Sequence, residues 1–322
     1  MSGLMRSGIR VAHWSNRPIV FAPLVRRAFS ATLLCLLLTR LSANAAEPKS
    51  EPPAQPRVAA NPIPGSLVIV GGGGMPDVIR DRFLELAGGR KGKLVVIPTA
   101  SEMADATSTY RSFSFWRSQG LSSVSMLNTL DRKRANDPSF VKPLMEATAA
   151  WLGGGDQSRL ANAYHDTAVE RELHRLLARG GVIGGTSAGA SIMSSVMITG
   201  GQTQASIGEG FGLLPDVVID QHFQNRKRQK RLLGVLENHP RCLGLGIDEQ
   251  TAVVVHGHSF TVLGKANVSL CMPPMERDSE SIKLLKSGDA GDLVELSKVV
   301  LTRLKTLPAK KASSAVSRAT TP

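Results

Sequence analysis

Apolar runs that end in glycine or small polar residues are the feature that most limits how this chain can fold. Helical stretches separate five such runs: 67–70, 93–101, 122–127, 149–156 and 180–185. Strands that are apolar throughout and alternate with helices are typical of a parallel sheet that is covered on both faces. The sequence therefore predicts an α/β fold with a mostly parallel sheet and helices on both faces. Functional residues are expected at the carboxyl ends of the strands.

The stretch 180–193, GGVIGGTSAGASIM, places Ser187 at the bend after one of these strands. The pattern Gly185-x-Ser187-x-Gly189 is that of a nucleophile elbow, where a serine occupies a tight strand-to-helix turn between small neighbours. A glycine-rich turn that serves packing alone has the same appearance, because such turns are common in α/β proteins. The rest of the chain has to decide between the two interpretations.

A serine hydroxyl needs a base to take its proton and a third group to orient that base. Of the seven histidines, only His222, in VVIDQHFQNR, directly follows an apolar strand. Glu249, in LGLGIDEQTA, follows another apolar strand, and the adjacent Asp248 is its rival as the acid. A packed histidine and a solvated acidic turn are the alternative interpretations of these two stretches.

The stretch GGGDQ, residues 153–157, places three glycines next to one another. Closely spaced glycines expose backbone N–H groups, and such donors can stabilise a developing oxyanion. We expect this role for the N–H groups of Gly155 and of Ala188, the residue after Ser187.

The stretch QNRKRQKR, residues 224–231, is strongly basic. If Asn225 caps a helix, Arg226 and the next two cations occupy its first turn, where they oppose the positive end of the helix dipole. Arg228 and Arg231 are three residues apart and share a helix face. Such a cluster can bind substrate carboxylates through paired N–H bonds. A solvated basic face is the alternative.

The first 45 residues have the pattern of a secretory signal peptide. Six arginines surround the apolar stretch Ala28–Leu38, and Ala43-Asn44-Ala45 supplies a cleavage site. The apolar stretch is too short for a membrane span, which needs about 20 residues. The sequence therefore predicts a secreted or periplasmic protein without a membrane span after cleavage. A buried helix of the mature fold is the alternative.

The remaining chain is predicted to divide into a proline-rich linker, 46–64, a catalytic domain, 65–300, and a basic, disordered tail, 301–322. The net charge is +13, and about +7 remains without the six arginines of the signal segment. Two tyrosines and no patterned arginine–aromatic surface argue against a nucleic-acid partner. The oligomeric state is left open, a homodimer included.

Metal and cofactor motifs are missing from the sequence. It contains no CxxC, HExxH or clustered His/Cys pattern, so we expect neither a metal nor a cofactor. Four glycines at 71–74 follow a strand, but Pro76 stands where G-x-G-x-x-G needs its third glycine. After signal cleavage Cys242 and Cys271 remain, and one disulfide between them is compatible with the sequence but not required by it.

Four of these stretches together resemble the cyanophycinase family, a serine peptidase family that also contains aspartyl dipeptidase. They are GGGDQ, GTSAGA, DQHF-x-x-R-x-R-x-x-R-L and GIDE-x-TA, and the resemblance covers about residues 65–275. It implies a fold similar to class I glutamine amidotransferases. It also implies Ser187 as nucleophile, His222 as general base and acid, and Glu249 as orienting carboxylate, with Glu209 as the alternative acid.

The resemblance further implies a substrate-binding set, and each required residue type is present: Gln157, Asp220, Gln221, Arg226, Arg228 and Arg231. Cyanophycin is a poly-aspartate backbone that carries an arginine on each side-chain carboxyl through an isopeptide bond. Each unit presents a carboxylate, which suits the arginines, and a guanidinium, which suits Asp220.

The expected function is thus that of an exported serine exopeptidase that hydrolyses cyanophycin or related Asp/Arg peptides to β-Asp-Arg dipeptides through an acyl-enzyme. An aspartyl or isoaspartyl dipeptidase is one alternative. A periplasmic peptide-binding protein without catalysis is another, and it would leave Ser187, His222 and Glu249 scattered.

Overall fold

The predicted apolar strands form the centre of a sheet in the computed structural model, which describes residues 62–103, 107–274 and 281–305. Five strands are mutually parallel and follow the spatial order β1-β5-β4-β2-β3. They are β1 (Ile63–Val70), β2 (Lys93–Ile97), β3 (Ser123–Met126), β4 (Ala149–Leu152) and β5 (Val182–Thr186). Their carboxyl ends therefore share one edge, and the turn after β5 carries Ser187.

Three antiparallel strands extend this sheet beyond β1, in the order β10-β11-β14. They are β10 (Thr251–Gly257), β11 (Ser259–Gly264) and β14 (Ala290–Asp292). A second sheet has the order β13-β12-β9-β8 and contains β8 (Val217–Gln221), β9 (Leu243–Ile247), β12 (Val268–Cys271) and β13 (Ile282–Leu285). The strands that precede His222 and Glu249, β8 and β9, thus belong to this second sheet and not to the sheet that carries Ser187.

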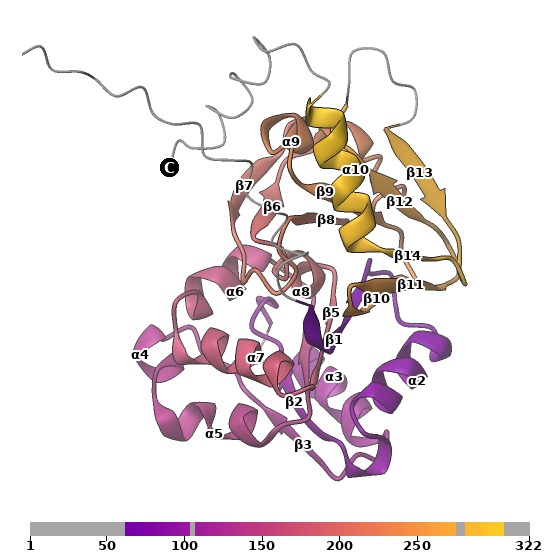
Figure 1. Cartoon of the computed structure of the whole chain (residues 1–322). Helices are drawn as coiled ribbons and strands as arrows, with labels where there is room; N and C mark the ends of the chain where they lie inside the picture. The colour runs from indigo at the N-terminus through magenta and orange to yellow at the C-terminus, as the bar shows by residue number, and fades with distance from the viewer. Residues whose placement is uncertain (1–61, 104–106, 275–280, 306–322) are drawn as a thin grey trace, which may run out of the picture. The chain divides into compact units, whose positions relative to one another are not determined.

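Helices cover both faces of the large sheet, as predicted (Figure 1). One face is covered by α2 (Asp77–Leu86) and α3 (Thr107–Arg117). The other is covered by α4 (Arg132–Ala135), α5 (Pro138–Glu146), α6 (Gln157–Tyr164) and α7 (Ala168–Ala178). The remaining elements are the 3₁₀ helix η1 (Gly89–Lys91), α8 (Ala188–Ser191), α9 (Gln229–Asn238), α10 (Leu293–Lys305), and a hairpin of β6 (Val196–Gly200) and β7 (Ser206–Glu209).

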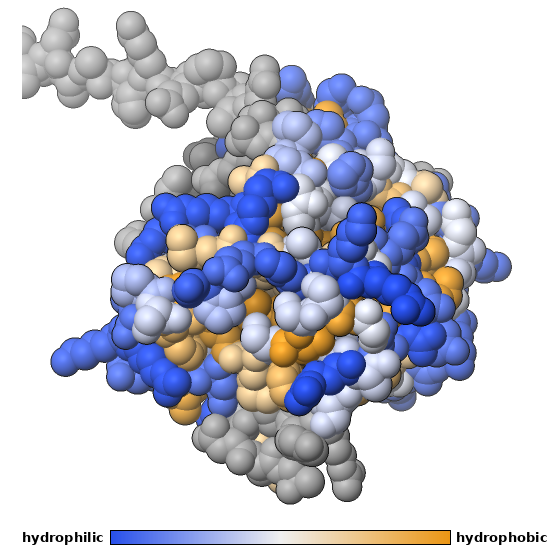
Figure 2. Space-filling view, turned by 90° about the horizontal axis from the view of Figure 1, so that it is seen from below, coloured by the Kyte–Doolittle hydropathy of each residue, from blue (hydrophilic) through white to orange (hydrophobic). Residues whose placement is uncertain are grey.

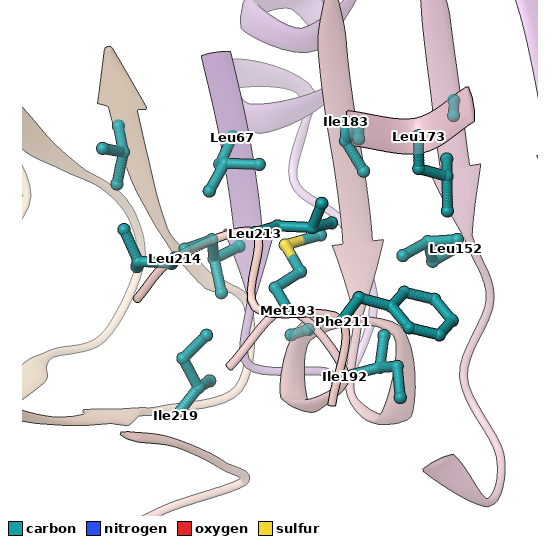
Figure 3. Close-up of a cluster of buried hydrophobic side chains, with 14 of the residues drawn as sticks. Leu67, Leu152, Leu173, Ile183, Ile192, Met193, Phe211, Leu213, Leu214 and Ile219 are labelled. Atoms are coloured by element: carbon teal, nitrogen blue, oxygen red, sulfur yellow. The ribbon is translucent and has the colours of Figure 1, made fainter. Parts of the chain in front are cut away.

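Successive apolar side chains of a strand point to opposite faces of the sheet, and this explains why both faces are covered. On β1, Leu67 and Ile69 pack into the core beneath α5–α7, whereas Val68 and Val70 pack against α2 and α3. All four side chains are fully buried. Figure 3 shows part of the core beneath α5–α7, where Leu67 and Ile183 of the sheet lie near Met193, which follows the turn at Ser187. The packing of these buried apolar side chains therefore holds the turn after β5 in a fixed position relative to the sheet.

Regular structure extends a few residues past both predicted ends of the catalytic domain. Strand β1 begins at Ile63, inside the predicted linker, because Ile63 pairs with Gly257 of β10. Helix α10 continues to Lys305, beyond the predicted end of the domain at residue 300, and buries Val300 against the core. Residues 1–61 and 306–322, which hold the predicted signal peptide, most of the linker and most of the tail, lie outside the described residues.

Cys242 and Cys271 are not joined by a disulfide. Across the described residues, no helix has both the length and the apolar character that a membrane span requires.

On the outer surface, apolar residues form patches between hydrophilic ones on the face that Figure 2 presents. A cavity of about 300 Å³ lies between β2, β3 and α5, lined among others by Lys93, Ser125 and Lys142. Because Lys93 is the first residue of β2, this cavity lies at the amino end of the sheet, opposite the edge that carries Ser187.

Candidate active site

Ser187 occupies a strained turn between β5 and α8. Its backbone has φ 53° and ψ −112°, a conformation that L-residues other than glycine rarely adopt. Its N–H donates to the carbonyl of Val70 at 3.0 Å, which fixes the turn to the end of β1. Strained residues of this kind persist where the surrounding structure over-determines them, as at a nucleophile elbow.

His222 directly follows β8 and is in contact with Ser187. The distance from His222 Nε2 to Ser187 Oγ is 2.9 Å, within hydrogen-bond range. His222 is 9% exposed and also has a positive φ, 51°. Its N–H donates to Gly71 O at 2.9 Å, so that the turn after β1 holds the histidine as well as the serine.

Glu249 supplies the carboxylate on the other side of the imidazole. Its Oε1 lies 2.6 Å from His222 Nδ1. Both rivals have other partners: Asp248 Oδ1 accepts from Gln224 N–H at 2.9 Å, and Glu209 lies 3.2 Å from the ring of His165. Serine, histidine and glutamate thus form one chain of two hydrogen bonds. In such a chain the histidine can take the hydroxyl proton while the carboxylate fixes its orientation.

The two expected oxyanion donors lie in the segment next to Gly154 and directly after the serine. Gly155 lies in the turn between β4 and α6, and Ala188 is the first residue of α8. The neighbouring Gly154 approaches Ser187 closely, since a Cβ on Gly154 would lie 3.5 Å from that of Ser187. Within the described ranges, neither Gly155 nor Ala188 has an acceptor for its N–H group. Both groups are therefore available to a ligand.

Asp220 and Arg231, expected to bind substrate, are buried and paired with each other. Arg231 Nε donates to Asp220 Oδ2 at 2.8 Å, and Nη2 donates to Oδ1. The side chain of Asp220 has no exposed surface and that of Arg231 is 3% exposed. Burial raises the pKa of Asp220, and the bonds from Arg231 oppose that rise. Arg231 thus occupies the position beside Asp220 that was expected for a substrate cation.

Gln157 and Gln221 are also buried and bonded within the protein. Gln157 Nε2 donates to the carbonyls of Ile198 and Thr199 in β6, at 2.6 and 3.2 Å. Gln221 Oε1 accepts from Arg228 Nη1. Both glutamines are less than a tenth exposed. They connect the β6–β7 hairpin and the end of β8 to their surroundings and present little surface to a ligand.

Arg228 is buried, and not all of its donor atoms have hydrogen-bond partners. Its Nη1 donates to Gln221, while its Nε has no hydrogen-bond partner. Burial lowers the pKa of Arg228 to about 10, assisted by the nearby charge of Arg231, while Asp220 opposes the shift. Arg226, two residues earlier, is exposed. Of the six expected substrate-binding residues, Arg226 is thus the exposed one, and Arg228 keeps one unpartnered donor, its Nε, which is itself buried.

The helix expected to start after Asn225 starts later. Helix α9 begins at Gln229, with Arg228 as its N-cap residue. Lys227 has φ 52°, so that the chain turns there instead of continuing as a helix. Arg226 and Lys227 therefore precede the helix, and the cations at its N-terminal end are instead Arg228, Lys230 and Arg231. Of these, Arg231 is paired with Asp220.

Two features of the structure were not given a role from the sequence. One is the glycine turn 71–74, which the sequence presents as an incomplete nucleotide motif but which contacts His222 and Glu249. The other is a group of possible metal ligands at the α6–α7 connection, formed by His165, Asp166 and Glu170. The ring of His165 already contacts the carboxylates of Glu170 and Glu209, each at 3.2 Å.

An α/β sheet with a serine elbow, a histidine and an acid in hydrogen-bond contact defines a serine-type hydrolase, a class that includes the serine peptidases. The comparison with protein families agrees: residues 67–263 match the model of peptidase family S51, and they contain the serine, the histidine and the glutamate. The chain belongs to peptidase family S51.

Relatives in this family include proteins named cyanophycinase. The cyanophycinase of Geminocystis herdmanii is 36% identical over 218 residues, which are 64% of this chain and 80% of the relative. That of Nostoc sp. is 36% identical over 217 residues, which are 62% and 72% of the two chains. The crystal structure of a peptidase from an acI-B1 Actinobacterium has a TM-score of 0.56 at 26% identity and covers 71% of this chain and 96% of its own.

Proposed function

We propose that this chain is an exported exopeptidase that degrades cyanophycin, multi-L-arginyl-poly-L-aspartate, to β-Asp-Arg dipeptides. The observation that carries the proposal is the continuous contact from Ser187 through His222 to Glu249. It provides the chemistry of amide hydrolysis in a chain whose relatives at 36% identity are named cyanophycinase.

The reaction would run through an acyl-enzyme. Ser187 Oγ attacks the backbone carbonyl of an aspartyl unit as its proton passes to His222 Nε2, and Glu249 stabilises the resulting imidazolium through Nδ1. The N–H groups of Gly155 and Ala188 donate to the oxyanion. His222 then gives the proton to the leaving amine, and the acyl-enzyme is hydrolysed by a water that His222 activates in the same way.

Arg226 and Arg228 would provide selectivity for the branched units. Each unit of the polymer carries a free carboxylate on its arginyl branch, and guanidinium groups bind carboxylates through paired N–H bonds. The exposure of Arg226 supports this assignment. The unpartnered Nε of Arg228 is buried, so Arg228 would join the contact through a movement of its side chain. Asp220, Gln157, Gln221 and Arg231 would contribute by holding the surrounding segments.

Export is the second element of the proposal. It is supported by the pattern of residues 1–45, with basic residues before an apolar stretch and Ala43-Asn44-Ala45 behind it. The N-terminus of the protein recovered from periplasm or medium would begin at or near Ala46. A protein that keeps residues 1–45 and stays in the cytoplasm would contradict export without affecting the proposed catalysis.

The test of the activity is incubation of the protein without residues 1–45 with insoluble cyanophycin, with the masses of the soluble products measured. Release of Asp-Arg dipeptide that stops in the Ser187→Ala variant supports the proposal. Hydrolysis of small β-aspartyl peptides without release from the polymer would instead indicate an isoaspartyl dipeptidase. An Ser187→Ala variant with undiminished activity would contradict the catalytic assignment.

A further inference from the structure

The glycine turn 71–74, which follows β1, contacts the segments that carry the catalytic residues. Two backbone hydrogen bonds define the first part of this relation. Val70 O accepts from the N–H of Ser187 at 3.0 Å, and Gly71 O accepts from the N–H of His222 at 2.9 Å. The end of β1 thus joins the elbow after β5 to the turn after β8, although these elements belong to different sheets.

The third segment is joined to the next residue of the same turn. Gly72 O accepts from the N–H of Gln250 at 2.8 Å, and Gln250 directly follows Glu249. Three successive carbonyls, those of residues 70 to 72, therefore fix the backbone beside each of the three catalytic side chains.

The side chains themselves rest against two of the glycines. A Cβ on Gly72 would lie 2.3 Å from His222 Cε1 and 2.5 Å from Nε2, the atom that faces Ser187. A Cβ on Gly73 would lie 2.4 Å from Glu249 Cβ and 2.6 Å from Oε2. A Cβ on Gly74, in contrast, would meet nothing within 4 Å.

We propose that Gly72 and Gly73 are positioning residues. Because they lack side chains, His222 can lie at hydrogen-bond distance from Ser187, and Glu249 can lie at hydrogen-bond distance from His222. The inference rests on the proposed catalytic roles of those three residues. Any side chain at position 72 would push the imidazole by roughly 1 Å to reach ordinary contact distance, and a displacement of about that size can cost about 10²-fold in rate.

Backbone strain alone does not distinguish these positions. Gly72, Gly73 and Gly74 all have positive φ, at 103°, 67° and 97°. Alanine is therefore strained at each of them. Only at the first two does it also collide with a catalytic side chain, so Gly74→Ala is the matched control.

The experiment compares Gly72→Ala, Gly73→Ala and Gly74→Ala. The first readout is the second-order rate at which a fluorophosphonate labels Ser187, because this small reagent needs the serine and its base but no polymer-binding residue. We expect a decrease of about 10²-fold or more in Gly72→Ala and Gly73→Ala, and a rate within about threefold of wild type in Gly74→Ala. The second readout is the downfield proton NMR signal of the His222 Nδ1–H bonded to Glu249, which Gly72→Ala and Gly73→Ala should lose.

A double-mutant cycle keeps the inference falsifiable if Gly72→Ala is poorly stable. In the His222→Ala background the imidazole is gone, so Gly72→Ala should lower the Tm distinctly less than it does in wild type. An equal decrease in both backgrounds would mean that strain, not the contact, sets the cost, and would overturn the inference. Labelling of Gly72→Ala at the wild-type rate would overturn it as well.

These outcomes are separate from those that test the proposed function. If Ser187→Ala is labelled as fast as wild type, the catalytic assignment fails, and the positioning role fails with it. If Ser187→Ala is unlabelled while Gly72→Ala reacts like wild type, the catalytic assignment stands and only the role of the glycine turn is refuted.

Discussion

Arg231 and Asp220 form a two-point ion pair inside the protein, with Nε donating to Oδ2 and Nη2 to Oδ1. The remaining guanidinium nitrogen, Nη1, donates to the carbonyl of Gly201 in the loop between β6 and β7. One arginine therefore links the end of β8, helix α9 and the β6–β7 hairpin. Both residues are thus bonded within the protein, whereas the family resemblance implies that they contact the substrate.

Removing one partner of this pair should destabilise the protein strongly. Arg231→Ala leaves the buried Asp220 carboxylate with only the longer contact to Arg228 Nη1, at 3.6 Å, and breaking a buried pair typically costs about 3–5 kcal/mol. We expect a loss of that size in the free energy of unfolding, measured by urea titration. Arg226→Ala, at an exposed position of the same segment, should change it by less than about 0.5 kcal/mol. Equal small effects of both variants would show that the ion pair does not form in solution.

Substrate recognition should depend on Arg226 in a way that catalysis does not. Arg226→Ala removes an exposed guanidinium, and loss of about 1.4 kcal/mol of binding to a carboxylate raises KM about tenfold. The KM for cyanophycin should therefore rise while the rate of fluorophosphonate labelling at Ser187 is unchanged. Lys230→Ala, which removes an exposed cation from α9, is the control and should leave KM unaltered. An equal rise of KM in both variants would indicate a general charge effect instead of a specific contact.

Glu249 and Asp248 should differ sharply when each loses its charge. Glu249→Gln removes the carboxylate that orients His222, and loss of the acid in a comparable triad lowers kcat by about 10⁴-fold. Since Glu249 is one-third exposed, we expect a decrease of about 10²–10⁴-fold in kcat with little change in KM.

Asp248→Asn provides the matched comparison. Asp248 accepts from the backbone N–H groups of Gln224 and Asn267 and does not touch the imidazole. Its loss of charge should lower the unfolding free energy by about 1–3 kcal/mol. A loss of kcat in Asp248→Asn as large as that in Glu249→Gln would contradict the assignment of the orienting role to Glu249 alone.

The positions of the three candidate catalytic residues could be predicted from the sequence because each follows a recognisable strand. Ser187 follows an apolar run and stands between small residues, while His222 and Glu249 follow VVIDQ and LGLGI. What the pattern does not contain is how strands separated in the chain pair with one another. Strands β8 and β9 are apolar and buried in the same way as those of the large sheet, so that nothing local indicates a second sheet.

The burial of the polar set could not be predicted for a related reason. Asp220 and Gln221 follow three apolar residues at the end of β8, and a polar residue at the end of a strand is normally exposed to solvent. They are buried because Arg228 and Arg231 return to them from the start of α9. These contacts depend on the turn at Lys227, which has a positive φ. Lysine rarely adopts this conformation, so the sequence does not predict the turn.

Cys271 should be unreactive in the folded protein over an unusually wide range of pH. Burial raises the pKa of its thiol from 9.0 to about 12, and the nearby charge of Asp220 adds to the rise. Because only the thiolate reacts, iodoacetamide at pH 9.5 should modify Cys271 in urea but not in buffer, as judged by the mass of the peptide that contains it. Because the pKa is higher in the folded state, this group stabilises that state fully below pH 9, and its contribution is lost as the pH rises towards 12. Equal modification in buffer and in urea would show that the strand β12 opens to solvent.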